Sequence, residues 1–489
     1  MKKKNIIYIL LYLLVAFCQE ATSQTLTLER AIRMAQDSSI AAFETRYDYL
    51  RQEWAYKAYE SSMKPQVMLT AQPMYLRQQF DPESKALSPS TINAFGTNLA
   101  VTYEQKIGKL GGSLYADSRH IWNELFGDMR SQYGMDRVFG VTPLRIGYRQ
   151  SLIGYNGFKW EKAMEEHNLR HALKEQIYRM QQIAEQTTAY YFDYVSAKEY
   201  YDTYRQNYLT TDTLYSIAKK KFMLTTVSRE ELMSMELERM NAKNQQDNAL
   251  TELQNARYSL LSYLRIPDKG QALELVLPSA PQTLVLDVQK AIDMAKANHP
   301  DLSAMDGRLI EAEQALDLAR HKMGLQANVD VSVGVQQYDK NYFKTFRDPK
   351  TYAAAMVGLS IPIYDGKLAK NRMRLAEAGM ETARLAAQEQ NRQLEESVIT
   401  TINSLETRLR TLPEAANGQV LADQAFALIQ RRYADGQIDI NTYMLAQNRK
   451  DQAHNIYTSL LCSFWMSYYK LCRLTMYDFI GQRELLLND

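Results

Sequence analysis

The sequence IPIYDGK (residues 361–367) opens the stretch that decides the fold. A single pattern of charged and apolar residues then runs to Arg432, the chain turns at YADGQID (residues 433–439), and a second pattern returns to Leu474. As one helix, residues 366–432 would be ~100 Å long at ~1.5 Å per residue, which is far longer than a helix of a compact domain. The sequence therefore predicts a helical hairpin that spans a long distance.

Both arms of this hairpin have the residue spacing of a coiled coil, with intervals of three and four. In the first arm the seam consists of Leu394, Val398, Thr401, Leu405, Glu406, Leu409 and Leu412. The return arm keeps the spacing without interruption through Ala453, Tyr457, Leu460, Phe464, Ser467, Leu471 and Leu474. Pro413 conflicts with this pattern, because a proline inside a helix costs ~3 kcal/mol and bends it. Either the long helix bends there or it is interrupted.

The same unit occurs earlier in the chain. SLIGYNGFKW (residues 151–160) opens a second long pattern, which turns at KKFMLTTVSREEL (residues 220–232) and returns to Leu264. Upstream, LTLERAIRMAQ (residues 26–36) corresponds to LVLDVQKAIDMAK (residues 284–296). Such an internal duplication predicts a pseudo-symmetric architecture.

The duplication divides the chain into a first repeat (24–264), a connector (265–283), a second repeat (284–475) and a tail (476–489). For the first repeat we expect a helix at 27–63, strands within 66–152, a long helix at 157–222 and a return helix at 227–264. For the second repeat the corresponding elements are a helix at 286–323, strands at 327–364, a long helix at 366–432 and a return helix at 438–475. The connector is expected to contain a short strand at 273–277, and the tail has no clear pattern.

The strand candidates alternate apolar and polar residues with a period of two. The first repeat has four candidates, at 66–80, 93–107, 113–122 and 137–152, and the second has two, at 327–338 and 351–364. This mixture fits a barrel wall with lipid outside and water inside better than a dry core. The 33 tyrosines suit the aromatic girdles of such a wall.

The first residues have the features of an export signal. Three lysines precede an apolar run, and Ala21 and Ser23 form a small-residue cleavage site, so residues 1–23 are expected to be removed. Lipidation at Cys18 is the alternative. Without the signal the chain has 55 basic and 55 acidic residues, so no nucleic-acid partner is expected. After the signal, no run approaches the ~18 apolar residues of a membrane-spanning helix.

No motif predicts catalysis or a cofactor. His167 and His171 are four residues apart, as two metal ligands on one helix face would be, but no third ligand is evident and a metal site is not expected. The methionines are attributed to core packing. Nucleophile elbows, phosphate-binding glycine loops and zinc-spaced cysteines are missing from the sequence, so we do not expect an enzyme.

The paired LTLxxA-type starts, the strand pairs before each long helix and the turn RRYADG (residues 431–436) resemble the TolC family of outer-membrane efflux proteins. The resemblance covers residues 26–475 and implies a mainly α-helical fold with membrane β-strands. It implies a homotrimer whose strands form one outer-membrane β-barrel, continued into the periplasm by a long α-helical coiled-coil barrel. The implied function is a passive exit duct of a tripartite efflux or type I secretion system.

The implied partners are outer-membrane lipid, a periplasmic adaptor and, through the adaptor, an inner-membrane RND or ABC transporter. The exported substrate, drug or peptide, is left open. The rival interpretation is a secreted coiled-coil scaffold that forms no channel.

The chain departs from the family pattern in its strands. The family has four strands per chain, whereas a hairpin near residues 95–122 would make six here and eighteen in a trimer, unless it folds outside the wall. Ser151 replaces the usual proline at the first strand exit, while Pro362 keeps it at the second. Gly157, Pro362 and Gly366 are the expected strand-to-helix turns.

The resemblance assigns functional roles to the two helix turns. The adaptor-contact residues would be Thr225, Thr226, Val227, Ser228, Gly436, Gln437, Ile438 and Asp439. The gate-bonding tyrosine falls on Tyr433 and its carboxylate partner on Glu231. The family's ring of inward acids falls on Thr442 and Leu445, which are not acidic.

Glu231 would then, with Glu230, supply the only negative charge at the constriction. The alternative is that the two glutamates only stabilise a helix N-terminus.

Overall fold

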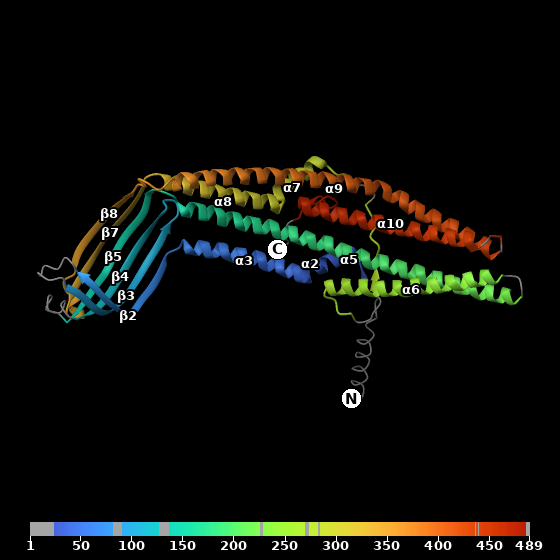
Figure 1. The fold of residues 1–489 in the computed structure, drawn as a ribbon, viewed down its shortest axis with the longest axis horizontal. Coiled ribbons are helices and arrows are strands. Elements are labelled where there is room, and N and C mark those ends of the chain that lie inside the picture. The colour runs from blue at the N-terminus through green and yellow to red at the C-terminus, as the bar shows by residue number, and fades with distance from the viewer. Residues whose placement is uncertain are drawn as a thin grey trace, which may run out of the picture. The chain divides into compact units, whose positions relative to one another are not determined.

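The computed structural model describes residues 24–81, 90–126, 136–224, 228–268, 273–281, 284–435, 437–438 and 440–485. The expected signal at 1–23 and the lipidation alternative at Cys18 lie outside these ranges. The chain divides into two compact units (Figure 1). The sheet unit comprises Tyr49–Ala172 and Asp301–Gln390, and the helix unit comprises Met1–Asp48, Leu173–Pro300 and Asn391–Asp489.

The sheet unit contains one six-stranded antiparallel sheet in the order β2-β3-β4-β5-β7-β8. Its strands are β2 (Gln66–Asp81), β3 (Ser90–Ile107), β4 (Gly112–Phe126), β5 (Arg137–Ile153), β7 (Gln326–Asp339) and β8 (Lys350–Ser360). The hairpin near 95–122, whose place the sequence left open, is β3–β4, and it lies inside the sheet (Figure 1). A 3-10 helix, Tyr342–Phe346, connects β7 and β8.

The two faces of this sheet differ in chemistry. One row of paired residues crosses all six strands with apolar or aromatic side chains: Val67, Tyr103, Ala116, Ile146, Val333 and Ala353. The next row, on the opposite face, is Met68, Thr102, Asp117, Arg145, Gly334 and Tyr352. In the second row Arg145 forms an ion pair with Asp117 at 2.7 Å. A soluble sheet buries its apolar face, whereas here Val333 is 57% exposed and Asp117 is 5% exposed.

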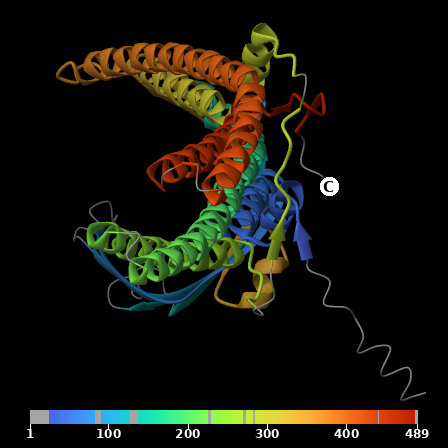
Figure 2. The same cartoon turned by 90° about the vertical axis from the view of Figure 1, so that its right-hand side faces the viewer.

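Two long helical hairpins dominate the rest of the chain. The first joins α5 (Gly157–Met223) to α6 (Arg229–Tyr263), and the second joins α9 (Leu368–Ala434) to α10 (Ile440–Thr475). Figure 2 looks at both hairpins from their turn ends. Helix α9 continues through Pro413, so the proline does not interrupt it.

The coiled-coil seams of the second hairpin are buried within the helix unit. In α9 the buried seam residues are Leu394, Val398, Thr401, Leu405 and Leu412, with Ile402 added to those the spacing predicts. In α10 Phe464 and Leu471 are fully buried. The seam is therefore a packed interface and not a solvated stripe.

Each expected short helix is in fact two helices, and the single helices predicted at 27–63 and 286–323 are wrong. The first divides into α2 (Leu28–Ser38) and α3 (Ile40–Ser62), and the second into α7 (Val288–Asn298) and α8 (Pro300–Met323). Ser39 and His299 have extended backbone between the halves. The Ser39 hydroxyl accepts a hydrogen bond from Ala42 N at 3.1 Å and so caps α3. In the second repeat Pro300 takes the first helical position, where its missing N–H costs nothing.

The core of the helix unit lies where both repeats begin. Strand β1 (Gln24–Leu26) pairs in parallel with β6 (Leu273–Leu275), which is shorter than the strand expected at 273–277. The Tyr191 hydroxyl of α5 lies 2.9 Å from the Leu26 carbonyl and 2.6 Å from the Val276 carbonyl. Burial raises the pKa of Tyr191 to about 12, so this hydroxyl remains a donor at neutral pH.

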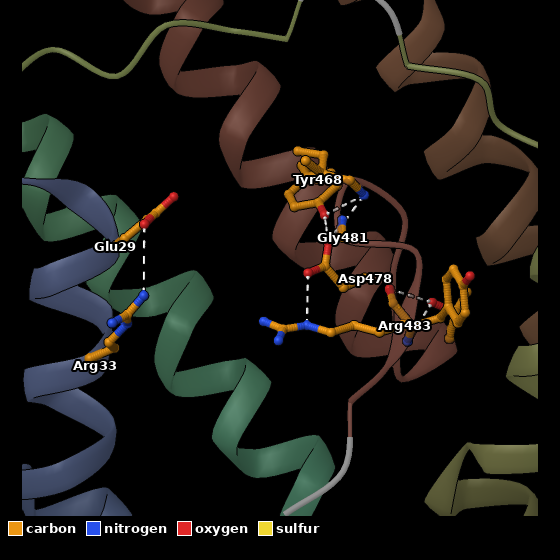
Figure 3. Close-up of polar contacts among 9 residues, drawn as sticks. Glu29, Arg33, Tyr468, Asp478, Gly481 and Arg483 are labelled. Atoms are coloured by element: carbon orange, nitrogen blue, oxygen red, sulfur yellow. Dashed lines mark hydrogen bonds and ion pairs between the residues drawn. The ribbon is translucent and has the colours of Figure 1, made fainter. Parts of the chain in front are cut away.

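The tail, which has no clear pattern in the sequence, forms a small hairpin of β9 (Tyr477–Asp478) and β10 (Arg483–Glu484). Figure 3 shows Asp478 at its centre, where the carboxylate accepts hydrogen bonds from the Tyr468 hydroxyl and from Gly481 N at 2.8 Å. Arg483 lies 3.6 Å from the other carboxylate oxygen. These bonds hold the tail against α10. Within the described residues, every helix is too short or too polar to cross a membrane.

Candidate functional site

The first candidate site is the turn between α5 and α6. Ser228 caps α6, because its side chain accepts a hydrogen bond from Glu231 N at 3.2 Å. Glu230 and Glu231 are exposed in the first turn of α6. The pKa of Glu230 is lowered by hydrogen bonds from its own backbone N–H and from the Ser228 hydroxyl. Both carboxylates therefore lie at the N-terminus of α6, where negative charge is favourable. Thr225, Thr226 and Val227 lie outside the described residues.

The second candidate site is the turn between α9 and α10. Tyr433 is half-buried, and its ring centroid lies 5.0 Å from that of Tyr443, which is buried. Gln437 N donates to the Arg432 carbonyl at 2.9 Å, and this bond closes the end of α9. Gln437 is exposed and Ile438 is half-buried. Gly436 and Asp439 lie outside the described residues.

The two turns interact electrostatically through Tyr433 and Glu231. The pKa of Tyr433 is raised first by burial and then by the charge of the Glu231 carboxylate. Thr442 is exposed, and Leu445 is 52% exposed. Asp435, at the end of α9, is a further exposed carboxylate at the second turn, and the role of the two glutamates at a constriction stays a prediction.

Polar bonds connect the two hairpins along α5 and α10. Arg473 Nε lies 2.7 Å from Glu185 Oε2, the Thr458 hydroxyl donates to Glu199 at 2.6 Å, and Asn207 donates to Asp451 at 3.1 Å. No local sequence signal indicates these pairs, because the partners are 244 to 288 residues apart and each is an ordinary polar residue in its own helix.

A polar cavity of about 580 Å³ lies among α5, α6 and α10. Its lining is dominated by side-chain amides, contributed by Asn207, Asn241, Asn244, Gln245, Asn248, Gln447, Asn448, Gln452 and Asn455. Gln447 is 4% exposed, and its Oε1 has no partner among the described residues. The helices are therefore less tightly packed here than in the apolar core.

The strand-to-helix turns in the sheet unit differ between the repeats. Gly366 has φ +63°, in the left-handed region that glycine tolerates, and Lys367 follows with φ +71°. Asp365 stabilises this turn by accepting hydrogen bonds from Lys367 N and Ala369 N, at 3.0 and 2.7 Å. Pro362 lies in the exposed segment before it.

In the first repeat α5 begins at Gly157, and the Asn156 side chain accepts a hydrogen bond from Lys159 N at 3.3 Å. The Asn156 side-chain carbonyl therefore caps the N-terminus of α5, and this turn does not use the positive φ angles that occur at Gly366 and Lys367 before α9.

The histidine pair packs inside the sheet unit. The rings of His167 and His171 are stacked, with centroids 6.2 Å apart. Burial, and then the neighbouring His171, lower the pKa of His167. Among the residues that the structure describes, no group of three or more His, Cys, Asp or Glu side chains could hold a metal ion.

Comparison with known proteins adds independent information. Residues 291–458 match the family model described as outer membrane efflux protein. No curated protein matches the chain.

Several solved structures share the fold over nearly the whole chain. The Campylobacter jejuni CmeC outer membrane channel is 13% identical, with a TM-score of 0.65, and the match covers 94% of this chain and 87% of that one. The outer membrane protein VceC of Vibrio cholerae is 11% identical, with a TM-score of 0.64, and the match covers 94% of this chain and 96% of that one. The open state of the Neisseria gonorrhoeae MtrE outer membrane channel is 12% identical, with a TM-score of 0.59, and the match covers 94% of this chain and 91% of that one.

The duplicated helical hairpins and the two-faced sheet agree with these matches. The chain is therefore similar to outer membrane efflux proteins, in sequence over residues 291–458 and in fold over nearly the whole chain.

Proposed function

We propose that this chain forms the passive exit duct of a tripartite efflux or type I secretion system, as a homotrimer in the outer membrane. The observation that carries the proposal is the two-faced sheet. One face carries apolar or aromatic side chains in a row across all six strands, while the opposite face holds the ion pair between Arg145 and the buried Asp117. Lipid outside and water inside is the environment that this distribution fits.

The unpaired edges of the sheet support assembly from several chains. Within this chain β2 and β8 are the edge strands, with 16 and 11 residues. Backbone groups in lipid need hydrogen-bond partners, so long open edges are not viable there. Sister chains supply those partners in a shared barrel. The family match and the fold do not favour the secreted scaffold.

The helix turns are the proposed periplasmic end of the duct. An adaptor would contact the residues of both turns, of which Ser228, Gln437 and Ile438 are described, and an RND or ABC transporter would act through the adaptor. The export signal at residues 1–23 accounts for delivery to the periplasm. The neutral mature chain is consistent with the absence of a nucleic-acid partner.

The assembly is tested by measuring the mass of the detergent-extracted protein. Two variants, each with a lysine introduced on one face of the sheet, are compared with the wild type. Ile146→Lys puts a charge toward lipid, which costs about 2–4 kcal/mol at the bilayer midplane, and should abolish recovery of trimer from the outer membrane. The control Thr102→Lys puts the same charge on the polar face opposite Asp117 and should leave the trimer intact. A soluble monomer, or equal effects of both changes, would overturn the proposal.

We place a gate at Tyr433 and Glu231, supported by the effect of the Glu231 charge on Tyr433. Glu231→Gln and Tyr433→Phe should raise single-channel conductance in planar bilayers, because each removes one of the two groups that the proposed gate would pair. Glu236→Gln, an exposed glutamate further along α6, is the matched control. Unchanged conductance in both gate variants would leave Glu231 with its helix-stabilising role alone.

A further inference from the structure

The hairpin β3–β4 has the same two-faced pattern as the rest of the wall. On its apolar face Leu99, Val101 and Leu114 are 40%, 42% and 38% exposed. On its polar face Tyr115 and Asp117 are 9% and 5% exposed. A hairpin folded away from the wall into water would show the opposite preference, with polar side chains exposed and apolar ones buried.

The hairpin is also bonded into the polar face of the neighbouring strands. Both Nε and a terminal nitrogen of Arg145 on β5 lie 2.7 Å from Asp117 Oδ2 on β4. The Tyr115 hydroxyl donates to Asp330 Oδ1 on β7 at 2.7 Å, passing over Gly147 of β5. A Cβ at position 147 would lie 2.3 Å from Tyr115 Cζ, so glycine is required for this crossing. The ladder between β4 and β5 runs from Gly112 to Glu124, so the hairpin is paired over nearly its whole length.

An even number of antiparallel strands makes the two sheet edges run in opposite directions. Strand β8 of one chain can therefore pair antiparallel with β2 of the next, as barrel closure requires. We propose that the outer-membrane part is an eighteen-stranded barrel in which every chain contributes six strands, β3 and β4 included. This inference rests on the homotrimer proposed above.

The consequence is a wider exit for cargo. Barrel diameter grows about linearly with strand number, so eighteen strands give a lumen ~1.5 times as wide as twelve, in the range that leaves an aqueous channel. The barrel then admits bulkier water-soluble cargo than a twelve-stranded barrel does. Size selection falls to the helix turns and not to the membrane wall.

Spin labels distinguish a hairpin in the wall from one outside it. Nitroxides are attached at Val101→Cys and Thr102→Cys on β3, and at Val333→Cys and Ser332→Cys on β7 as the reference pair. The unsubstituted protein is the blank for labelling. Burial raises the pKa of Cys462 to about 11 and of Cys472 to about 12, which keeps both thiols protonated and slow to react. The nitroxide at position 101 should collide with oxygen dissolved in the lipid as often as the nitroxide at position 333 does. The nitroxide at position 102 should instead collide with a nickel chelate dissolved in the water.

The outcomes separate this inference from the proposed function. If position 333 faces lipid but 101 and 102 both face water, the hairpin lies outside the wall and the eighteen-stranded barrel is wrong, while the channel stands. If position 333 also faces water, the membrane wall itself is wrong.

Polymer exclusion tests the width of the lumen. Polyethylene glycols are added on the barrel side of a planar bilayer, and the largest polymer that still lowers the conductance is recorded. The cut-off diameter should be ~1.5 times that of a family channel with four strands per chain measured in the same lipid. An equal cut-off would overturn the wider lumen.

Discussion

Loss of the Arg145 guanidinium is expected to weaken the barrel wall far more than loss of Arg149, four residues further along the same strand. Asp117, the partner of Arg145, has a side chain that is 5% exposed, and Arg145 itself is 31% exposed. Arg149 is 65% exposed, and its partner Asp330 is 23% exposed. Both guanidinium groups also lie over the same tyrosine ring, at 5.4 and 5.5 Å, so this contact is matched.

The magnitude follows from what each change leaves behind. Arg145→Met keeps most of the side-chain volume but leaves the buried carboxylate of Asp117 without its cation, and breaking a buried ion pair in this way costs about 3 kcal/mol or more. Arg149→Met breaks an exposed pair, which is worth at most about 1 kcal/mol. Asp330 also keeps its hydrogen bond from the Tyr115 hydroxyl.

The assay is urea unfolding of the detergent-solubilised trimer, followed by circular dichroism and tryptophan fluorescence. Arg145→Met should lower the unfolding midpoint clearly and Arg149→Met barely. Adding Asp117→Asn to Arg145→Met removes the orphaned charge and should restore much of the loss. Equal midpoints for the two single variants would refute the assignment of Asp117 to a desolvated polar face.

Three further changes probe other parts of the structure. Gly147→Ala should lower the yield of trimer, because its Cβ would overlap the Tyr115 ring, whereas Gly358→Ala, with nothing within 4 Å, should have the normal yield. Burial lowers the folded-state pKa of His167 below its ordinary 6.5, so its contribution to stability is full above that value and is lost as the pH falls below it. From about pH 7.5 to about pH 5.5 the wild type should therefore lose more stability than His167→Gln, and parallel losses would contradict this. Pro413→Ala restores an N–H inside α9 and should raise the free energy of unfolding by up to ~3 kcal/mol, which is seen as a higher urea midpoint. A lower midpoint would mean that the packing of α9 depends on the proline.

The long helices could be predicted because coiled-coil spacing, as from Leu394 to Leu412, lies within patterns of charged and apolar residues that are too long for a compact domain. The break at Ser39 could not, because one extended residue leaves the apolar period on either side almost unchanged, whereas Pro300 is a local signal for the break at His299. The strands were recognisable by their period of two, but that period does not say which strands are neighbours. The place of β3–β4 in the sheet therefore became clear only from the residue pairing between neighbouring strands in the structure.

The candidate site was only partly predictable for a similar reason. Capping by Ser228 is local, and its spacing from Glu231 indicates it. The bonds between α5 and α10 join residues of different repeats, such as Glu185 and Arg473, and no local pattern connects them. The amide-lined cavity likewise depends on three helices whose amides are individually unremarkable in sequence.

Single-channel recording on the purified trimer in planar lipid bilayers tests the central claim most directly, since that claim is a water-filled path enclosed by strands from three chains. We expect discrete, long-lived conductance steps without any energy source, reduced by polymers small enough to enter the lumen. A trimer that inserts into lipid but never conducts, or a protein that remains a soluble monomer, would contradict the account.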